Sequence, residues 1–187
     1  MATTTRDTII KSALFLASIA EEDYLNPTNK KRYDEIFDFI RRNLIGNHRL
    51  AFTKKENVVL QTAGEAGWYL EPDDLCQYGA GEQPKEIRIK EYDNNNVLEK
   101  RTEIKPKRNN QITYFADVEY YTSFPPPMIE ALKLKFTEAI SMLRHPVNPQ
   151  LMAYFYNQSV EQEGKIQTWI QWAESPVTHG YGQTGGY

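Results

Sequence analysis

Residues 117–146, DVEYYTSFPPPMIEALKLKFTEAISMLRHP, decide the fold because a strand ends and a helix begins inside them. The prolines at positions 125, 126 and 127 cannot donate hydrogen bonds to a sheet ladder, so they end the strand. Proline also fixes φ near the helical value, so the last of them suits the first helical turn. A wide apolar stripe at helical spacing then predicts an amphipathic helix, formed by Met128, Ile129, Leu132, Phe136, Ala139, Ile140 and Leu143.

Two helices are predicted before this stretch. The first has Thr4 or Thr5 as its cap, and its buried face carries Ile9, Ile10, Ala13, Leu14, Ala17 and Ala20. The second is expected to begin with Asn26 as the cap and Pro27 in the first helical position, and to end at Gly46. Its apolar stripe consists of Tyr33, Ile36, Phe37, Ile40 and Leu44.

A last helix is predicted from about residue 149 to about residue 172. The sequence Asn148-Pro149 repeats the helix start seen at Asn26. Its middle, NQSVEQEGKIQ, is polar on most faces and contains Gly164, which disfavours a helix by about 1 kcal/mol relative to alanine. We therefore expect this helix to project from the body rather than to be buried along its length.

The residues between the helices have short, turn-punctuated β patterns. Residues 50–61 predict one or two strands, and residues 62–67, TAGEAG, predict a loop. Residues 87–105 predict a hairpin whose turn falls at residues 93–96. Residues 111–118 predict a strand, with one face formed by Ile112, Tyr114, Ala116 and Val118.

These elements predict an α+β fold that is mainly α, with a bundle of about four helices, two N-terminal and two C-terminal. The β-rich insertion lies at about residues 48–118. The predicted domains are a helical core (residues 1–47 plus 124–172), the β-rich insertion (residues 48–123) and an extended, flexible C-terminal segment (residues 173–187). That segment is rich in glycine and poor in aliphatic residues, so it is not expected to fold alone.

Composition limits the class of protein. The chain has 187 residues, a net charge of −3, one cysteine and no apolar run that approaches the roughly 18 residues of a membrane span. A single cysteine excludes an intramolecular disulfide, and the N-terminus does not read as a signal peptide. We expect a soluble protein kept in a reducing interior, with no membrane partner. The twelve tyrosines favour surfaces that become half-buried against partners, or equally a tyrosine-rich periphery of the core.

Residues that could catalyse or bind metal form no recognisable set. His48, His145 and His179 lack the spacing of a zinc helix, and Cys76 has no partner nearby in the sequence. The acids of EPDDLCQY, Glu71, Asp73 and Asp74, lack the ligand spacing of a calcium loop, so a solvated turn is favoured over a cation site. We therefore expect no enzyme activity, no catalytic residue, no metal and no cofactor.

A basic segment could contact DNA or a partner. Residues 100–108 contain five cations and one acid, and the cations are Lys100, Arg101, Lys105, Lys107 and Arg108. Such clusters are more often solvated faces, and no motif that recognises a specific DNA sequence accompanies this one. A nucleic-acid-binding accessory protein is nevertheless an alternative function. A cell-wall hydrolase is a less favoured one, since it needs a carboxyl group with a raised pKa in a cleft.

The order of elements resembles the head-to-tail adaptor (connector, head-completion) proteins of tailed bacteriophages, called tail tubular protein A in short-tailed phages. The motifs that carry the resemblance are TIIKSALFLASIA (residues 8–20), NLIGNHRLAF (43–52), WYLEPDDLCQY (68–78) and, most closely, FPPPMIEALKLKFTEAISML (124–143). The likeness covers most of residues 7–172. The chain departs from the family pattern at residues 48–50, where members often carry Pro-Trp, and at Glu71, which is an added residue.

The resemblance implies a structural virion protein without enzyme activity. It implies a ring, usually of twelve copies, that docks under the portal protein at the capsid vertex, receives the downstream tail or nozzle protein and lets genomic DNA pass during ejection. Such a protein is located at the head–tail junction of the virion and is assembled in the host cytoplasm. We expect the last helix and the C-terminal segment to reach the portal through Trp169, Trp172, Tyr181 and Tyr187. The alternative is that both tryptophans pack on their own subunit.

Overall fold

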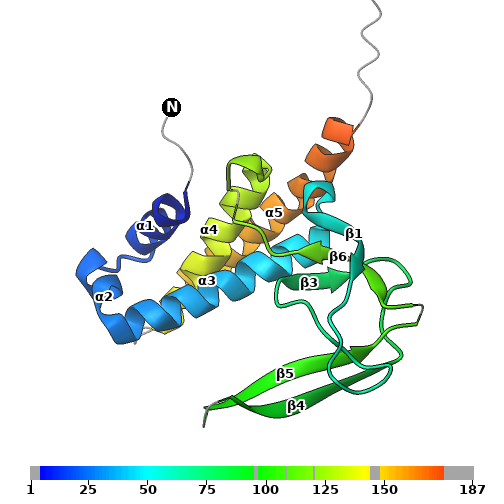
Figure 1. Cartoon of the computed structure of the whole chain (residues 1–187). Coiled ribbons are helices and arrows are strands. Elements are labelled where there is room, and N and C mark those ends of the chain that lie inside the picture. Colours follow the sequence, from blue (N-terminus) through cyan, green and yellow to red (C-terminus); the bar gives the residue numbers. More distant parts are fainter. Residues whose placement is uncertain (1–4, 95–96, 108, 120, 144–147, 175–187) are drawn as a thin grey trace, which may run out of the picture.

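The structure is a computed structural model that describes residues 5–94, 97–107, 109–119, 121–143 and 148–174. Its helices are α1 (Arg6–Leu16), α2 (Glu21–Leu25), α3 (Pro27–His48), α4 (Pro126–Ser141) and α5 (Pro149–Glu174), with short 3-10 turns η1 (Ala51–Thr53) and η2 (Tyr121–Ser123). Its strands are β1 (Lys54–Val59), β2 (Tyr69–Leu70), β3 (Leu75–Tyr78), β4 (Glu86–Asn94), β5 (Val97–Lys105) and β6 (Gln111–Ala116). The predicted class is confirmed: this is an α+β protein, mainly α, with helices on both sides of a β region in the sequence (Figure 1).

The predicted helix starts are confirmed by their caps. The Thr5 hydroxyl accepts a hydrogen bond from the Thr8 amide, and the Thr8 hydroxyl accepts one from the Thr5 amide, which forms a reciprocal capping box. The Asn26 side chain accepts from the Thr28 amide at 3.1 Å. The Asn148 side chain accepts from the two amides at positions 150 and 151, so both Asn-Pro sequences act as helix starts.

The N-terminal helices differ from the prediction at two points. Helix α3 does not end at Gly46 but continues to His48, where Arg49 adopts the left-handed conformation with φ 48°. Gly46 serves a different purpose: a Cβ there would lie 3.3 Å from the Cys76 carbonyl oxygen, so glycine lets strand β3 approach the helix closely. The short helix α2 was not predicted, since five residues are too few to show a period.

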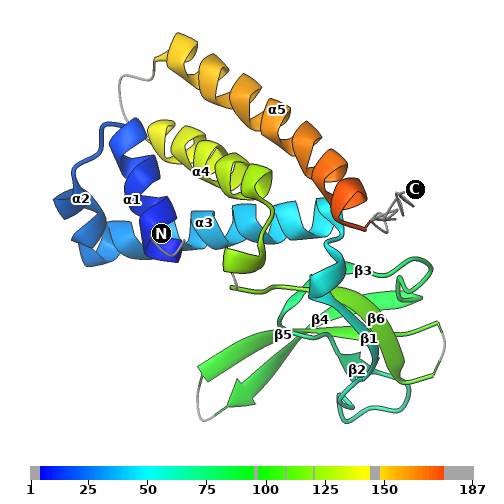
Figure 2. The same ribbon diagram turned by 90° about the horizontal axis from the view of Figure 1, so that it is seen from above.

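Helix α4 lies at the centre of the helical core. Helices α1, α3 and α5 all pack against it (Figure 2). The prediction that the last helix projects from the body was wrong, because α5 lies along α4 and buries a narrow stripe that consists of Met152, Phe155, Ser159 and Ile166. The polar residues that suggested projection occupy its other faces.

The β region consists of two small antiparallel sheets. One has the order β1-β6-β3 and the other the order β2-β5-β4. The predicted hairpin is confirmed, with an unbroken register from Glu86 opposite Lys105 to Asn94 opposite Val97. Strands β2 and β3 were not predicted, because they are too short to give an alternating pattern, and β3 lies in the EPDDLCQY stretch that was read as a solvated turn.

Strand β6 is buried on both faces. Its Phe115 belongs to the hydrophobic cluster of the helices. Its Ile112, Tyr114 and Ala116 face the other way and pack with Leu60 and Ile104 in a second cluster. The sheet β1-β6-β3 therefore forms a middle layer between the helices and the sheet β2-β5-β4.

A buried arginine holds the chain that returns from β6 to α4. Arg41 of α3 is 3 % exposed and donates two hydrogen bonds to the Asp117 carboxylate, at 2.9 and 2.7 Å. It also donates to Glu119 at 3.0 Å and to the Tyr121 hydroxyl at 2.9 Å. Burial alone would lower the pKa of Arg41, but the hydrogen bonds and charge of Asp117 raise it, so the guanidinium stays charged. This cluster fixes the β region on the helices.

Candidate interaction surfaces

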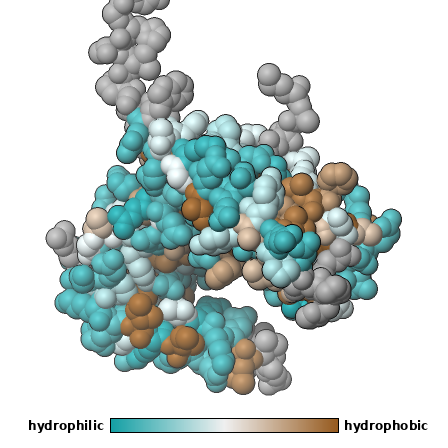
Figure 3. Space-filling model, turned by 180° about the vertical axis from the view of Figure 1, so that it is seen from behind, coloured by the Kyte–Doolittle hydropathy of each residue, from teal (hydrophilic) through white to brown (hydrophobic). Residues whose placement is uncertain are grey.

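The β4–β5 hairpin forms an arm that extends from the body (Figures 1 and 2). Residues that pair across the two strands point to the same face, so Ile87, Ile89 and Leu98 share one face with Ile104. Ile104 is buried at the base of the arm, whereas Ile87, Ile89 and Leu98 are 58 %, 72 % and 69 % exposed. We call these three residues the hairpin stripe. Figure 3 shows apolar side chains spaced along this arm as far as its tip.

The same arm carries three of the five cations that were considered for DNA contact, and each of the three pairs with an acid. Lys100 pairs with Glu91 at 3.2 Å and Arg101 with Glu99 at 2.8 Å. Lys105 pairs with Glu86 at 3.1 Å. Residues 86–105 contain five acids and five bases, so the two strands together carry no net charge. Lys107 is exposed just beyond the hairpin, and Arg108 lies outside the described residues.

The other face of the arm contains a buried carboxylate, Glu103. Glu103 has no exposed surface, because the side chains of Arg88 and Tyr92 lie over it and donate hydrogen bonds to it. Burial raises the pKa of Glu103, but these two hydrogen bonds outweigh it, so the pKa is lowered. The Arg88 guanidinium also lies 3.9 Å from the centre of the Trp68 ring. The loop that contains Trp68 is thereby fixed against the hairpin.

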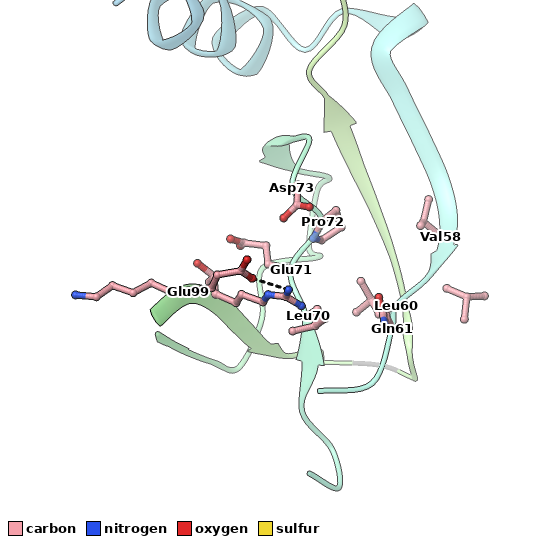
Figure 4. A pocket seen from close by; sticks show the side chains of 12 residues that line it. Val58, Leu60, Gln61, Leu70, Glu71, Pro72, Asp73 and Glu99 are labelled. Carbon is pink, nitrogen blue, oxygen red and sulfur yellow. Dashed lines mark hydrogen bonds and ion pairs between the residues drawn. The ribbon is translucent and has the colours of Figure 1, made fainter. Parts of the chain in front are cut away.

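A cavity of about 600 Å³ opens between the end of β1, the loop after β2 and strand β5. Figure 4 shows Leu60, Leu70 and the acids Glu71, Asp73 and Glu99 around it. Glu71 accepts a hydrogen bond from the Tyr78 hydroxyl, and Glu99 pairs with Arg101.

Asp74, considered above with Glu71 and Asp73 as a cation ligand, is bound to protein groups. It pairs with Lys55 at 2.5 Å and accepts from the Tyr114 hydroxyl at 2.8 Å. Burial raises the pKa of Asp74, but these partners lower it below its ordinary value. Within the described residues no three side chains of histidine, cysteine, aspartate or glutamate gather as metal ligands would.

Cys76 and His48, which were considered as catalytic or metal-binding residues, are both partly buried among other side chains. Burial, followed by the charge of Asp117, raises the pKa of the Cys76 thiol to about 12, so the thiol is almost fully protonated at neutral pH. His48 lies at the junction of α3 and α5, where its Nδ1 is 3.1 Å from the Gln167 amide nitrogen and its Nε2 is 3.7 Å from Glu163. Burial lowers the pKa of His48. His145 and His179 lie outside the described residues.

The helical core exposes large apolar side chains on two surfaces that the sequence reading missed. Phe15 of α1 is 82 % exposed and stands beside Lys11, Ser12, Leu16 and Lys133; we call these five residues the Phe15 face. The second surface is a groove of about 340 Å³ between α3, α4 and α5, which we call the α4 groove. Apolar and polar side chains line it in equal number: Phe39, Ile40, Leu44, Ala139 and Met142 are apolar, and Asn43, Asn47, Lys135, Glu138 and Glu163 are polar.

A signal for these surfaces is present in the sequence. Phe15, Phe39 and Met142 are large apolar residues that fall outside the apolar stripes of their own helices. A soluble helix does not need such residues on its polar face, so each marks a surface where a contact is to be sought.

Of the four aromatic residues predicted to bind the portal, the structure describes the side chain of Trp169 alone. Trp169 lies near the end of α5 and is half-buried. Trp172 also belongs to α5, but its side chain lies outside the described part of the structure. Tyr181 and Tyr187 lie outside the described residues altogether.

Among the described residues, no helix is both long enough and apolar enough to cross a bilayer. No protein-family model matches the chain, and no curated protein matches it.

Proposed function

We propose that the chain is a structural subunit of a ring that docks under a phage portal and connects the capsid to the tail, leaving a channel for DNA. The observation that carries the proposal is the exposure of large apolar side chains on three separate surfaces. These surfaces are the Phe15 face, the α4 groove and the hairpin stripe. A monomer that works alone has no need of three such surfaces, whereas a ring subunit contacts two neighbours and the proteins above and below it.

The order of the helices and the FPPPMIEALKLKFTEAISML stretch also support this proposal through their resemblance to head-to-tail adaptors. The proposed ring has twelve copies, forms in the host cytoplasm and resides at the head–tail junction of the virion. The C-terminal aromatics Trp169, Trp172, Tyr181 and Tyr187 are proposed to anchor it to the portal. The arm with the hairpin stripe is proposed to contact the tail or nozzle protein.

The neutral hairpin fits a channel through which DNA passes. A channel that carried many unpaired cations would hold the phosphate backbone and slow its passage. The pairing of Lys100, Arg101 and Lys105 with acids leaves the arm without net charge, so contact with DNA would be transient. If the nucleic-acid alternative were correct, electrophoretic mobility shifts would show strong binding at low salt that is lost steeply as salt rises.

The main experiment measures the mass of assemblies. Gel filtration with light scattering would be run on the chain alone, on the portal of the same phage and on their mixture. The proposal expects a complex with about twelve copies of the chain per portal ring. A matched chain without residues 173–187 should keep its circular dichroism spectrum and lose portal binding. A full-length chain that never joins the portal would refute the adaptor function, and a truncated chain that docks with unchanged affinity would refute the C-terminal anchor.

One observation favours the hydrolase alternative and defines its test. Burial raises the pKa of Glu138, which lines the α4 groove together with Glu163. Glu163 is paired with Lys135 at 2.8 Å. Glycoside hydrolysis uses two carboxyl groups, of which the general acid has a raised pKa. Clearing of a peptidoglycan suspension by the wild-type chain, abolished in Glu138→Gln, would establish this activity, and the adaptor proposal expects no clearing by either protein.

A further inference from the structure

The Phe15 face carries a protruding side chain, whereas the α4 groove is concave. Phe15 stands out from α1 as an aromatic ring that is 82 % exposed. The groove is concave, and the apolar side chains Phe39, Ala139 and Met142 line it. A protruding aromatic ring and an apolar hollow are the two halves of a typical anchor contact, in which one buried aromatic residue contributes much of the binding energy.

The two surfaces lie on opposite sides of helix α4. Lys133 stands beside Phe15, whereas Met142 lines the groove. Nine residues separate them, and at about 100° per residue this spacing places them about 180° apart around the helix axis. One molecule therefore cannot fill its own groove with its own Phe15. Two copies can make the contact, and because it uses different surfaces on the two copies, it can be repeated around a ring.

Charge also favours this pairing. Glu138 lines the groove, is half-buried and has no ion pair or hydrogen bond of its side chain within the described residues. Lys135 pairs with Glu163 at 2.8 Å and its charge also acts on Glu138, so these three side chains together carry one net negative charge. The Phe15 face contributes Lys11, whose ion pair with Glu21 is exposed on both sides and therefore weak. Lys11 can exchange Glu21 for Glu138 of another copy at little cost.

We propose that Phe15 of one copy inserts into the α4 groove of the next copy, with Lys11 facing Glu138, and that this is the contact between neighbours in the ring. The inference deepens the proposed function and rests on it for the closure of the ring. The contact itself is testable on the chain alone.

Disulfide trapping tests the contact directly. The variant Ser12→Cys/Ala139→Cys keeps Phe15 and places one thiol beside it on the Phe15 face and one inside the groove, and cysteine is close to serine and to alanine in size. Under mild oxidation we expect covalent dimers and higher multimers on a non-reducing gel. The matched control is Ser12→Cys/Tyr154→Cys, because Tyr154 is exposed on α5 about 180° around that helix from the groove residue Glu163. Equal yields of multimers from the two variants would overturn the proposal.

Mixing experiments test whether the two surfaces differ. Phe15→Asp removes the protrusion and Met142→Asp charges the rim of the groove, so each variant keeps one intact surface. Each alone should associate at least about tenfold more weakly than wild type in sedimentation experiments. Their equimolar mixture should form dimers that do not grow further, because one intact contact remains. Growth of the mixture to wild-type size, or failure of the mixture to dimerise when wild type does, would contradict the pairing.

A charge exchange tests the role of Lys11. The single substitutions Lys11→Glu and Glu138→Lys should each weaken association, and the double variant Lys11→Glu/Glu138→Lys should recover most of it. If the double variant associates no more tightly than the weaker of the two single variants, Lys11 and Glu138 do not pair in the contact.

These results separate the contact from the function. Rings on the portal without trapping between positions 12 and 139 would refute the contact and leave the adaptor function intact. Trapped multimers from a chain that never joins a portal would support the contact and refute the adaptor function. Neither trapping nor rings would refute both.

Discussion

Replacing Arg41 with methionine tests whether the buried cluster fixes the β region on the helices. Methionine keeps most of the length of the aliphatic stem, so the packing of α3 changes little and the lost interactions are polar. The substitution removes two hydrogen bonds to Asp117, one to Glu119 and one to Tyr121. It leaves the Asp117 carboxylate, which is 9 % exposed, without its buried partner.

The expected loss of stability is large. Breaking a buried, hydrogen-bonded ion pair by removing one partner costs about 3–5 kcal/mol, because a buried charge is left behind. The matched control is Arg42→Met: Arg42 donates to the same carboxylate at 2.9 Å but is 46 % exposed. An exposed pair contributes about 0.2–1 kcal/mol. Arg42→Met removes one exposed hydrogen bond to the carboxylate, whereas Arg41→Met removes two buried ones, so the two substitutions should differ several-fold in cost.

The assay is urea unfolding followed by circular dichroism, with the free energy of unfolding extrapolated to water. The double variant Arg41→Met/Asp117→Asn should be no less stable than Arg41→Met alone, since the uncompensated charge is gone. Equal losses for Arg41→Met and Arg42→Met, both under about 1 kcal/mol, would refute the reasoning that burial gives the cluster its strength.

Three further changes have expected outcomes. Phe37→Ala should lower the free energy of unfolding in urea by about 3–5 kcal/mol, because the fully buried ring packs edge-on against Phe136, with the ring centres 5.3 Å apart. Phe39→Ala, on the exposed face of the same helix, should lower it by less than about 0.5 kcal/mol. Burial lowers the pKa of His48, so below about pH 6.5 the unfolded chain binds more protons than the folded one. The free energy of unfolding should therefore fall as the pH drops below this value, and it should fall less in His48→Gln than in the wild type. The Cys76 thiol, with a pKa raised to about 12, should react with a disulfide reagent far more slowly in the folded chain than in urea at the same pH, and equal rates would contradict its burial.

The sequence predicts those parts of the fold that are determined locally. The starts at Thr5, Asn26 and Asn148 were correct because a cap depends on residues within a single turn. The hairpin was correct because its turn residues and its alternation lie in one stretch. Gly46 was misread because its purpose depends on strand β3, about thirty residues away, and nothing beside it in the sequence indicates that contact.

Tertiary packing determined the features that were missed. The stripe of α5 is narrow, with Phe155 and Ile166 eleven positions apart, so the polar residues between them concealed the buried face. The basic segment looked cationic because it was read along one strand, whereas its acids, such as Glu86 and Glu91, lie on the other. The α4 groove combines residues of three helices, so only the packed structure brings Phe39 and Met142 to one surface.

Strand β6 restricts how such chains can be recombined. Alternate side chains of β6 belong to two different hydrophobic clusters, one of which is formed mainly by the helices. The β region therefore cannot be replaced by that of another protein by joining the chains only at its two ends. A graft from another protein would have to supply a large apolar side chain at the position of Phe115 and an acid at the position of Asp117, or else α3 would lose both a packing partner and its counter-ion. Related chains are therefore expected to change their insertion and their third helix together.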